Sequence, residues 1–266
     1  MGGVSRKVCL AVAACGLSIW AGERAPTAEE QERFVAATRE VVRGYARSLP
    51  DFICTQRIHR SSTTARSEDV LTVRLSYSSR GEEYKLVELN GVATDLPYEA
   101  LRGFVTRGEF GSLLWGVFAP EAGGRFRFVR WDRFEGRRAA VYSYRVSLGD
   151  SGPYRIQWRD ERTGEFRSAD AGLNGLLFID AGTGAILRIT ATATDIPRSF
   201  PVRKSTTAIS YRYAEIGRRR YLLPSEAVTE TSTAGTSHRN RVEFLNYSKF
   251  SADSSIHFEG EEGQEK

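Results

Sequence analysis

Short segments in which apolar and polar residues alternate follow one another from Asp51 almost to the end of the chain. A period of two residues is typical of strands with one buried face, and Asn90-Gly91 and Gly182-Thr183-Gly184 have the composition of hairpin turns. Tight turns favour antiparallel pairing, because parallel crossovers need a dozen or more residues. The expected strands are 52–58, 71–77, 84–89, 126–131, 139–148, 154–159, 176–180, 186–193, 206–213, 221–223, 226–232 and 241–247.

One long amphipathic helix is expected before the strands. Thr27 and Glu30 have the spacing of a capping box, with a hydroxyl at the cap and a carboxylate three residues later. Apolar residues such as Phe34 and Tyr45 then recur at helical spacing until Pro50. The pattern predicts a helix over about 28–48 whose apolar stripe needs a partner surface.

An apolar insertion interrupts the strands between residues 92 and 124. Residues 97–105 have a helical composition with Asp95 as the expected cap. Residues 110–118 carry apolar side chains at spacings of three and four, and Pro120 ends them. We expect two short helices here, lying against the concave side of the sheet because they are too hydrophobic for a solvated loop.

The predicted fold class is α+β and mostly antiparallel β. A meander of about eleven strands must curl or close, so we expect an incomplete, half-open β-barrel with the N-terminal helix and two short helices covering its concave face. The 266-residue chain has 41% hydrophobic and 27% charged residues, which is ordinary for a globular protein. We assign residues 27–250 to one domain and 259–266 to a disordered acidic tail.

The first 21 residues have the order of a secretory signal peptide. Arg6 and Lys7 precede an apolar run from Val8 to Ala21, which is too short for a transmembrane helix. Residues 12–15 resemble a bacterial lipobox in which Cys15 is lipidated, and cleavage near Ala21 is the alternative. Export is expected in both cases, with peripheral membrane association if Cys15 is lipidated.

Motifs for catalysis, metals and cofactors fail on inspection. The segment from Gly149 to Pro153 resembles a serine-protease nucleophile loop but is equally a good hairpin turn, and His59 lacks the setting of a catalytic base. His59, His238 and His257 have no metal-binding spacing. Cys54 alternates with Phe52 and is interpreted as a buried filler.

We expect no enzyme, no metal and no cofactor, with a hydrolase as a remote alternative. The net charge of +5 is mild and arginines are spread along the whole chain, so nucleic-acid binding is not expected.

Aromatic residues gather in the middle of the chain and leave two interpretations open. One is an aromatic-rich core, and the other is an apolar cleft between the sheet and the inserted helices that holds an acyl chain. The candidate lining residues are Phe104, Phe110, Leu113, Leu114, Trp115, Phe118, Phe128, Tyr142 and Tyr144.

Several segments in this order resemble the LolA-like lipoprotein carriers and outer-membrane lipoprotein-sorting proteins. Leu49–Gln56 is similar to the passage from helix to first strand with its Phe-x-x-x-Gln pattern, 177–189 to a strand–turn–strand element, and 221–224 and 242–247 to the closing strands. The resemblance implies an unclosed barrel with helices in its concave face. The insertion at 92–124 is longer than in the family, and the ligand-contacting arginine of the carriers has no matching position.

The leading hypothesis is a non-catalytic envelope protein of a Gram-negative-type bacterium, periplasmic or associated with the outer membrane. It would bind an acyl chain, lipid or lipoprotein, with 110–118 as a movable lid. The alternative is an envelope protein–protein interaction module whose barrel is filled by its own side chains.

Overall fold

Twelve strands form an antiparallel sheet in the computed structural model, which describes residues 24–65, 68–101, 109–149, 154–160 and 163–250. The strands are β1 Phe52–Ser62, β2 Asp69–Ser78, β3 Gly81–Leu89, β4 Val92–Ala93, β5 Arg125–Phe134, β6 Arg137–Val146, β7 Tyr154–Arg159, β8 Phe166–Asp180, β9 Ile186–Thr194, β10 Lys204–Ile216, β11 Arg219–Ser232 and β12 Ser237–Lys249. The leader at 1–21, with Cys15, and the tail at 259–266 lie outside the described residues.

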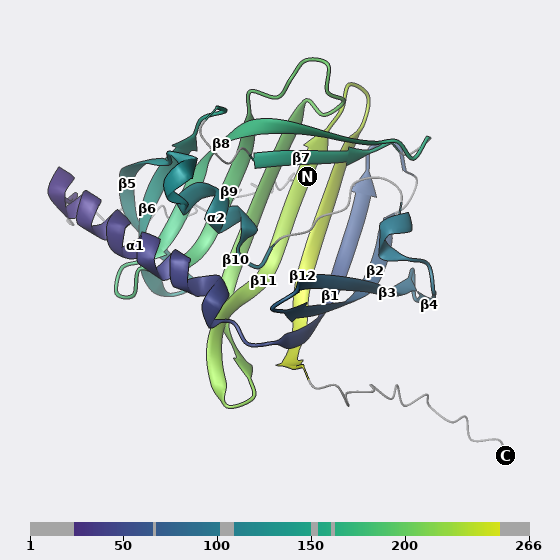
Figure 1. The fold of residues 1–266 in the computed structure, drawn as a ribbon, viewed down its shortest axis with the longest axis horizontal. Coiled ribbons are helices and arrows are strands. Elements are labelled where there is room, and N and C mark those ends of the chain that lie inside the picture. Colours follow the sequence, from purple (N-terminus) through teal and green to yellow (C-terminus); the bar gives the residue numbers. More distant parts are fainter. Residues whose placement is uncertain (1–23, 66–67, 102–108, 150–153, 161–162, 251–266) are drawn as a thin grey trace, which may run out of the picture.

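The strand order is β4-β3-β2-β1-β12-β11-β10-β9-β8-β6-β5, with β7 paired to the first part of β8. The first strand therefore pairs with the last, so the two ends of the strand series meet inside the sheet and not at its edges. Among the described strands, the edges β4 and β5 are not paired to each other. The predicted mostly antiparallel, half-open barrel is confirmed, because the sheet curls around its helices and stays open (Figure 1).

Helix α1, Ala28–Ser48, has the bounds that the sequence predicts. Its capping box is formed: the Glu30 amide donates to Thr27 Oγ1 at 3.2 Å, and the Thr27 amide donates to Glu30 Oε2 at 2.7 Å. The apolar stripe packs on the concave face of the sheet, where the Phe34 ring stacks on Tyr142 with centroids 5.7 Å apart. The helix thus finds the partner surface that its amphipathic pattern requires.

Only the second of the two expected inserted helices is formed. Helix α2, Ser112–Phe118, lies with α1 over the concave face (Figure 1). The helix expected over 97–105 is wrong: a single 3-10 turn, η1 Tyr98–Ala100, ends at Leu101, whose ψ of 130° has left the helical region. Asp95 does not cap it, because Pro97 takes the cap position and makes no side-chain bond. Residues 102–105 lie outside the described ranges, and a second 3-10 turn, η2 Pro120–Ala122, follows α2.

Most strands are longer than expected, and two of them differ from the expected pattern most. Residues 221–223 and 226–232 form one strand, β11, because a bulge at Ser225 absorbs the break in the alternation. Strand β8 begins at Phe166, ten residues before its expected start at Leu176, and the added part pairs with β7. Small residues between Ser168 and Gly172 carry no alternating pattern, so this extension was not visible in the sequence.

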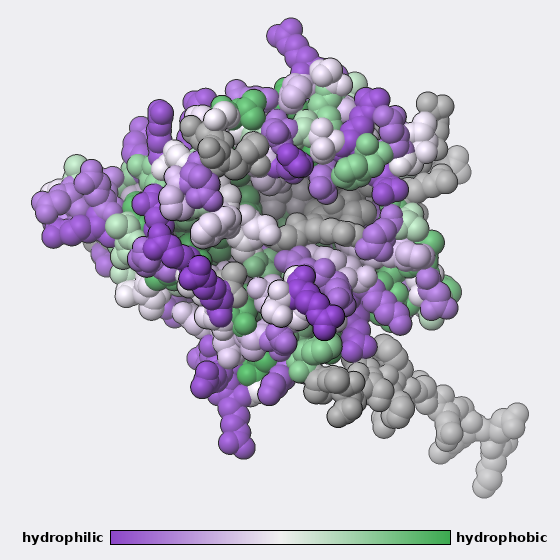
Figure 2. Space-filling model, viewed as in Figure 1, coloured by the Kyte–Doolittle hydropathy of each residue, from purple (hydrophilic) through white to green (hydrophobic). Residues whose placement is uncertain are grey.

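The hydrophobic core lies between the concave face and the helices. Alternate residues of β1, among them Phe52, Cys54 and Ile58, point into it, as the period of two predicts. A smaller cluster around Ile156 and Trp158 of β7 packs separately from the main core. On the face shown in Figure 2, hydrophobic residues form separate groups among hydrophilic ones, so the continuous apolar surface is turned inward.

Candidate functional site

Most of the predicted lining residues lie in the core between α2 and the sheet. Six of them are between 1% and 8% exposed: Phe110, Leu113, Leu114, Phe118, Tyr142 and Tyr144. Phe128 is half-buried, whereas Trp115 on α2 is 46% exposed. Phe104 lies outside the described residues. The fold therefore brings together the side chains of one face of α2 and the aromatic residues of β5 and β6.

Phe110 is surrounded by four other aromatic rings. Its centroid lies 5.1 Å from that of Phe52, 5.9 Å from Tyr77, 5.6 Å from Phe244 and 6.4 Å from Tyr247. These rings come from the neighbouring strands β2, β1 and β12, of which β12 is far from the other two in sequence. Tilted and edge-to-face contacts of this kind are favourable beyond the area they bury. They anchor the start of the α2 segment in the concave face.

A second group of rings holds the end of α2 and the middle of α1. Phe118 stacks on Phe126 at 5.0 Å, and Tyr142 lies between Phe34 at 5.7 Å and Phe128 at 5.6 Å. In the described residues, aromatic side chains thus fill the space that the sequence interpretation treats as a cleft.

Burial favours the neutral forms of two side chains inside the sheet, Cys54 and Tyr142. Burial raises the pKa of the Cys54 thiol far above its usual range, and burial raises the pKa of Tyr142 to about 12. Cys54 is 1% exposed, so its interpretation as a buried filler is confirmed. A thiol that stays protonated is a poor nucleophile.

The histidines of the described residues lie in unrelated places. His59 Nδ1 faces Glu68 Oε1 at 3.2 Å on β1, whereas His238 is buried on β12 and packs edge-on against Trp158 at 5.4 Å. His257 and the segment 150–153 lie outside the described ranges. Within these ranges no three His, Cys, Asp or Glu side chains are grouped so that they could hold a metal ion.

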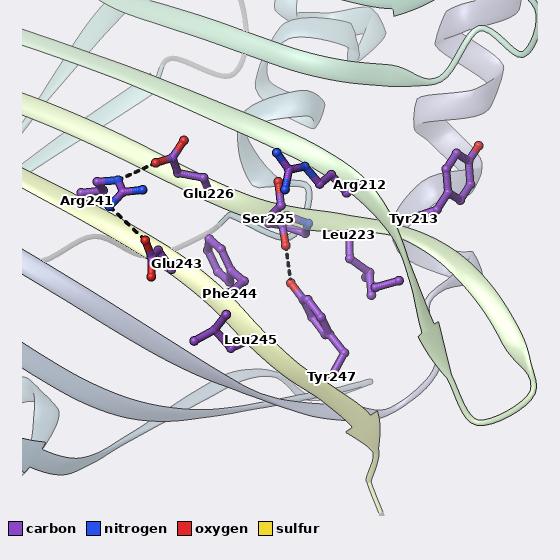
Figure 3. A pocket seen from close by; sticks show the side chains of 12 residues that line it. Arg212, Tyr213, Leu223, Ser225, Glu226, Arg241, Glu243, Phe244, Leu245 and Tyr247 are labelled. Atoms are coloured by element: carbon purple, nitrogen blue, oxygen red, sulfur yellow. Dashed lines mark hydrogen bonds and ion pairs between the residues drawn. The ribbon is translucent and has the colours of Figure 1, made fainter. Parts of the chain in front are cut away.

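A pocket of about 420 Å³ lies where β10, β11 and β12 meet (Figure 3). Arg241 bridges Glu226 at 2.6 Å and Glu243 at 2.9 Å, and the Ser225 hydroxyl donates to the Ser210 carbonyl at 3.1 Å. Arg241 thus pairs with both carboxylates, and the Ser225 hydroxyl donates to a backbone carbonyl and not to a general base. A second groove of about 840 Å³ is lined by β1, β2, β3 and β12 and contains Arg74 and Lys85.

Sequence reasoning missed a set of polar residues that the fold buries. Asn240, Thr229, Thr231, His238 and Ser205 are all 6% exposed or less. The signal was present as threonines at alternate positions of a strand whose other inward residue is Ala227. It was not recognised because threonine is equally common on exposed strand faces.

Comparison with known proteins gives similarity in fold alone. No protein-family model and no curated protein matches the sequence. A LolA superfamily protein from Nitrosomonas europaea is 8% identical with a TM-score of 0.42, covering 83% of this chain and 93% of that one. An outer membrane lipoprotein-sorting protein domain from Vibrio parahaemolyticus is 11% identical with a TM-score of 0.34, covering 84% and 94%.

A DUF1329 family protein from Desulfovibrio piger is also similar, at 10% identity and a TM-score of 0.35, covering 83% of this chain and 95% of that one. The names of the Nitrosomonas europaea and Vibrio parahaemolyticus structures are those of the group that the sequence resembles. Similarities this distant carry no argument on ligand or activity. No helix in the described ranges is both long and apolar enough to span a membrane.

Proposed function

We propose that this protein is an exported, non-catalytic carrier that binds a hydrophobic ligand, such as the acyl chain of a lipid or lipoprotein, beneath α2. The observation that carries the proposal is the apolar concave face of a sheet that stays open and is covered there by helices. Each CH₂ group moved from water into such a surface gains about 0.8 kcal/mol. The leader at 1–21 supports export to the cell envelope of a Gram-negative-type bacterium.

Binding would require α2 to move. Phe110, Val117 and Phe118 are at most 3% exposed and occupy the space over the sheet, so an acyl chain enters only by displacing them. The displaced surface is apolar on both sides, and a hydrocarbon chain replaces the lost contacts with similar ones. Residues 110–118 would then act as the lid, and Trp115 on their exposed side would move with them.

The same burial favours a second candidate, an envelope protein–protein interaction module whose barrel is filled by its own side chains. In this case α2 is a permanent part of the core and the partner docks elsewhere. The two candidates differ in one measurable property, because only the carrier takes up an acyl chain.

Ligand uptake tests the proposal. Native mass spectrometry of the mature protein, purified from a lipid-rich extract, should show bound lipid. The delipidated protein should bind a fluorescent fatty acid, and this binding should be saturable. A protein that carries no lipid and takes up no fatty acid would leave the interaction module as the better account.

Leu114→Asp and Trp115→Asp form a matched pair of variants for this test. Both add a charge to α2, but Leu114 is 2% exposed and faces the sheet, whereas Trp115 is 46% exposed. A carboxylate beneath α2 should weaken fatty-acid uptake at least tenfold, and the same group on the exposed side should change it less than twofold. Equal effects of the two variants would contradict binding beneath α2. Circular dichroism of both variants reports whether the fold is kept.

A further inference from the structure

Six polar side chains form two rows across three neighbouring strands on the concave face. The first row is Asn240, Thr229 and Thr207, and the second is His238, Thr231 and Ser205, each in direct register across β12, β11 and β10. Direct partners in antiparallel strands point to the same face. We call these six residues the polar block.

An apolar row adjoins the polar block on the same three strands. Val242, Ala227 and Ile209 are two residues further along and are 1–2% exposed. Two residues along a strand correspond to about 7 Å. The concave face therefore changes from apolar to hydrogen-bonding side chains over about 7 Å. An amphiphile, which joins a hydrocarbon chain to a polar head, has the complementary pattern.

The polar block is buried at a cost that its own contacts do not fully offset. The Thr207 and Thr229 hydroxyls lie 3.2 Å apart, and the Tyr154 hydroxyl of β7 bonds to Thr207. Thr231, at 1% exposed, has a hydroxyl with no hydrogen-bond partner. A buried hydroxyl without a partner is rare in folded proteins, so the Thr231 hydroxyl has hydrogen-bonding capacity left for a bound group.

Strand β7 lies across the block as a cover (Figure 1). Besides the Tyr154 bond, its Trp158 ring packs against His238 at 5.4 Å, so this crossing is a contact and not an effect of the view. Arg60 lies opposite Asn240 on β12 and opposite Asp69 on β2, so the register positions that flank the block carry one charge of each sign. A cover of aromatic residues and balanced charge suit an uncharged polar group.

We infer that the polar block binds the uncharged, hydroxyl- or amide-bearing head of an amphiphile whose hydrocarbon chain lies on the apolar row and beneath α2. This inference rests on the proposed carrier function and adds the chemistry of the ligand's polar end. Thr231 supplies the hydroxyl that bonds to the head, with the other block side chains as further donors and acceptors.

The head-group site can be tested with two ligands that have the same hydrocarbon chain. Monododecylglycerol has two hydroxyls, and dodecyl methyl ether has none. The wild-type protein should bind monododecylglycerol more tightly. Thr231→Val keeps the side-chain shape and removes the hydroxyl, so it should weaken monododecylglycerol binding about 3- to 10-fold and leave ether binding unchanged. Because the hydroxyl has no partner in the free protein, the same variant should melt about 2 °C higher.

Thr206→Val is the matched control, because Thr206 lies on the opposite face of β10 next to the polar block. Thr206→Val should change the affinity for neither ligand. Thr229→Val, within the polar block, should weaken monododecylglycerol binding as Thr231→Val does. If the wild-type protein binds both ligands equally and Thr231→Val changes nothing, the head-group site is refuted and the carrier function stands. Equal weakening of both ligands by Thr231→Val also refutes the site. If neither ligand binds, the carrier function itself fails, and the head-group site fails with it.

Discussion

Asp180 is the last residue of β8, and its carboxylate accepts several hydrogen bonds. Its Oδ2 accepts from Arg137 Nε at 2.7 Å, and its Oδ1 accepts from both the amide and the hydroxyl of Thr183 at 2.8 Å. Burial by itself would raise the pKa of Asp180, but the bonds from Arg137 and Thr183 outweigh it and hold this pKa below its usual range. One residue thus closes the β8–β9 turn and ties it to β6.

Asp180→Asn should lower the free energy of unfolding by about 2 kcal/mol at pH 7. Because the pKa of Asp180 is lower in the folded protein, its stabilisation is complete above the unfolded value of about 4 and is lost as the pH falls through the folded value. Urea unfolding at a series of pH values should show that the difference in free energy of unfolding between the wild type and Asp180→Asn disappears below about pH 4. Asp170→Asn, which removes an exposed partner of Arg155, should cost less than about 1 kcal/mol. If the stability difference between the wild type and Asp180→Asn does not depend on pH, the charged form of Asp180 is not what stabilises the fold.

Gly175 marks a place where the sheet has no room for a side chain. A Cβ atom at this position would lie 1.8 Å from the carbonyl oxygen of Thr190, the same oxygen that accepts a 2.9 Å bond from the Tyr144 hydroxyl. Backbone atoms inside a sheet cannot give way as a flexible side chain does.

Gly175→Ala should therefore destabilise the protein by about 3 kcal/mol. Gly44→Ala is the control: it lies in α1 with nothing within 4 Å of an added Cβ, and it should stabilise by about 0.5–1 kcal/mol. Thermal unfolding of the two variants should give shifts of opposite sign. If Gly175→Ala leaves the stability unchanged, β8 and β9 must be able to separate at this point.

At the scale of elements, α1 and α2 are held by different forces. Helix α1 has 21 residues and a complete capping box, whereas α2 has seven residues and begins at Gly111 without a side-chain cap. A helix as short as α2 is not stable alone, so the burial of Leu114, Val117 and Phe118 holds it in place. Helix α2 therefore depends on its tertiary contacts more than α1 does.

Hydrogen exchange should distinguish the two helices when dodecanoic acid binds. The amides of Trp115 and Ala119, which donate to Gly111 and Trp115 at 2.8 Å, should exchange faster if the acyl chain replaces α2 on the sheet. Amides of α1 should keep their rates. Slower exchange in α2 with the ligand bound would show that the lid does not open, and that the acyl chain lies elsewhere.

At the scale of the whole molecule, one edge of the open sheet, strand β5, has features that discourage pairing with another chain. Strand β5 has a bulge between Phe128 and Arg130, and the Phe128 amide donates to Gln31 Oε1 of α1 at 3.2 Å. Bulges and arginine side chains along an edge discourage pairing with another chain. The helix that covers the concave face therefore also protects the edge that an unclosed barrel leaves.

The fold could be read from local patterns because each of them has a direct physical cause. A period of two, turn glycines and a capping box define strands, hairpins and α1, and the number of strands requires curling. The helix expected over 97–105 failed for a reason of the same kind: its apolar residues signal burial, and burial does not require helix. Phe110, Phe118 and Tyr142 were recognised as inward-facing, but whether they fill or line the interior depends on distances that no pattern contains.

The amino-acid sequence by itself determined the alternation that builds an antiparallel wall and the amphipathic helix that covers it. Only the tertiary structure decided that the first strand pairs with the last, that β7 crosses the concave face, and that Thr207, Thr229 and Thr231 stand in register with Asn240 and His238 inside it. The reason is that alternation places a side chain on one of two faces but does not say which face becomes the interior. Strand order and curvature make that choice, and they arise from contacts between residues more than a hundred positions apart.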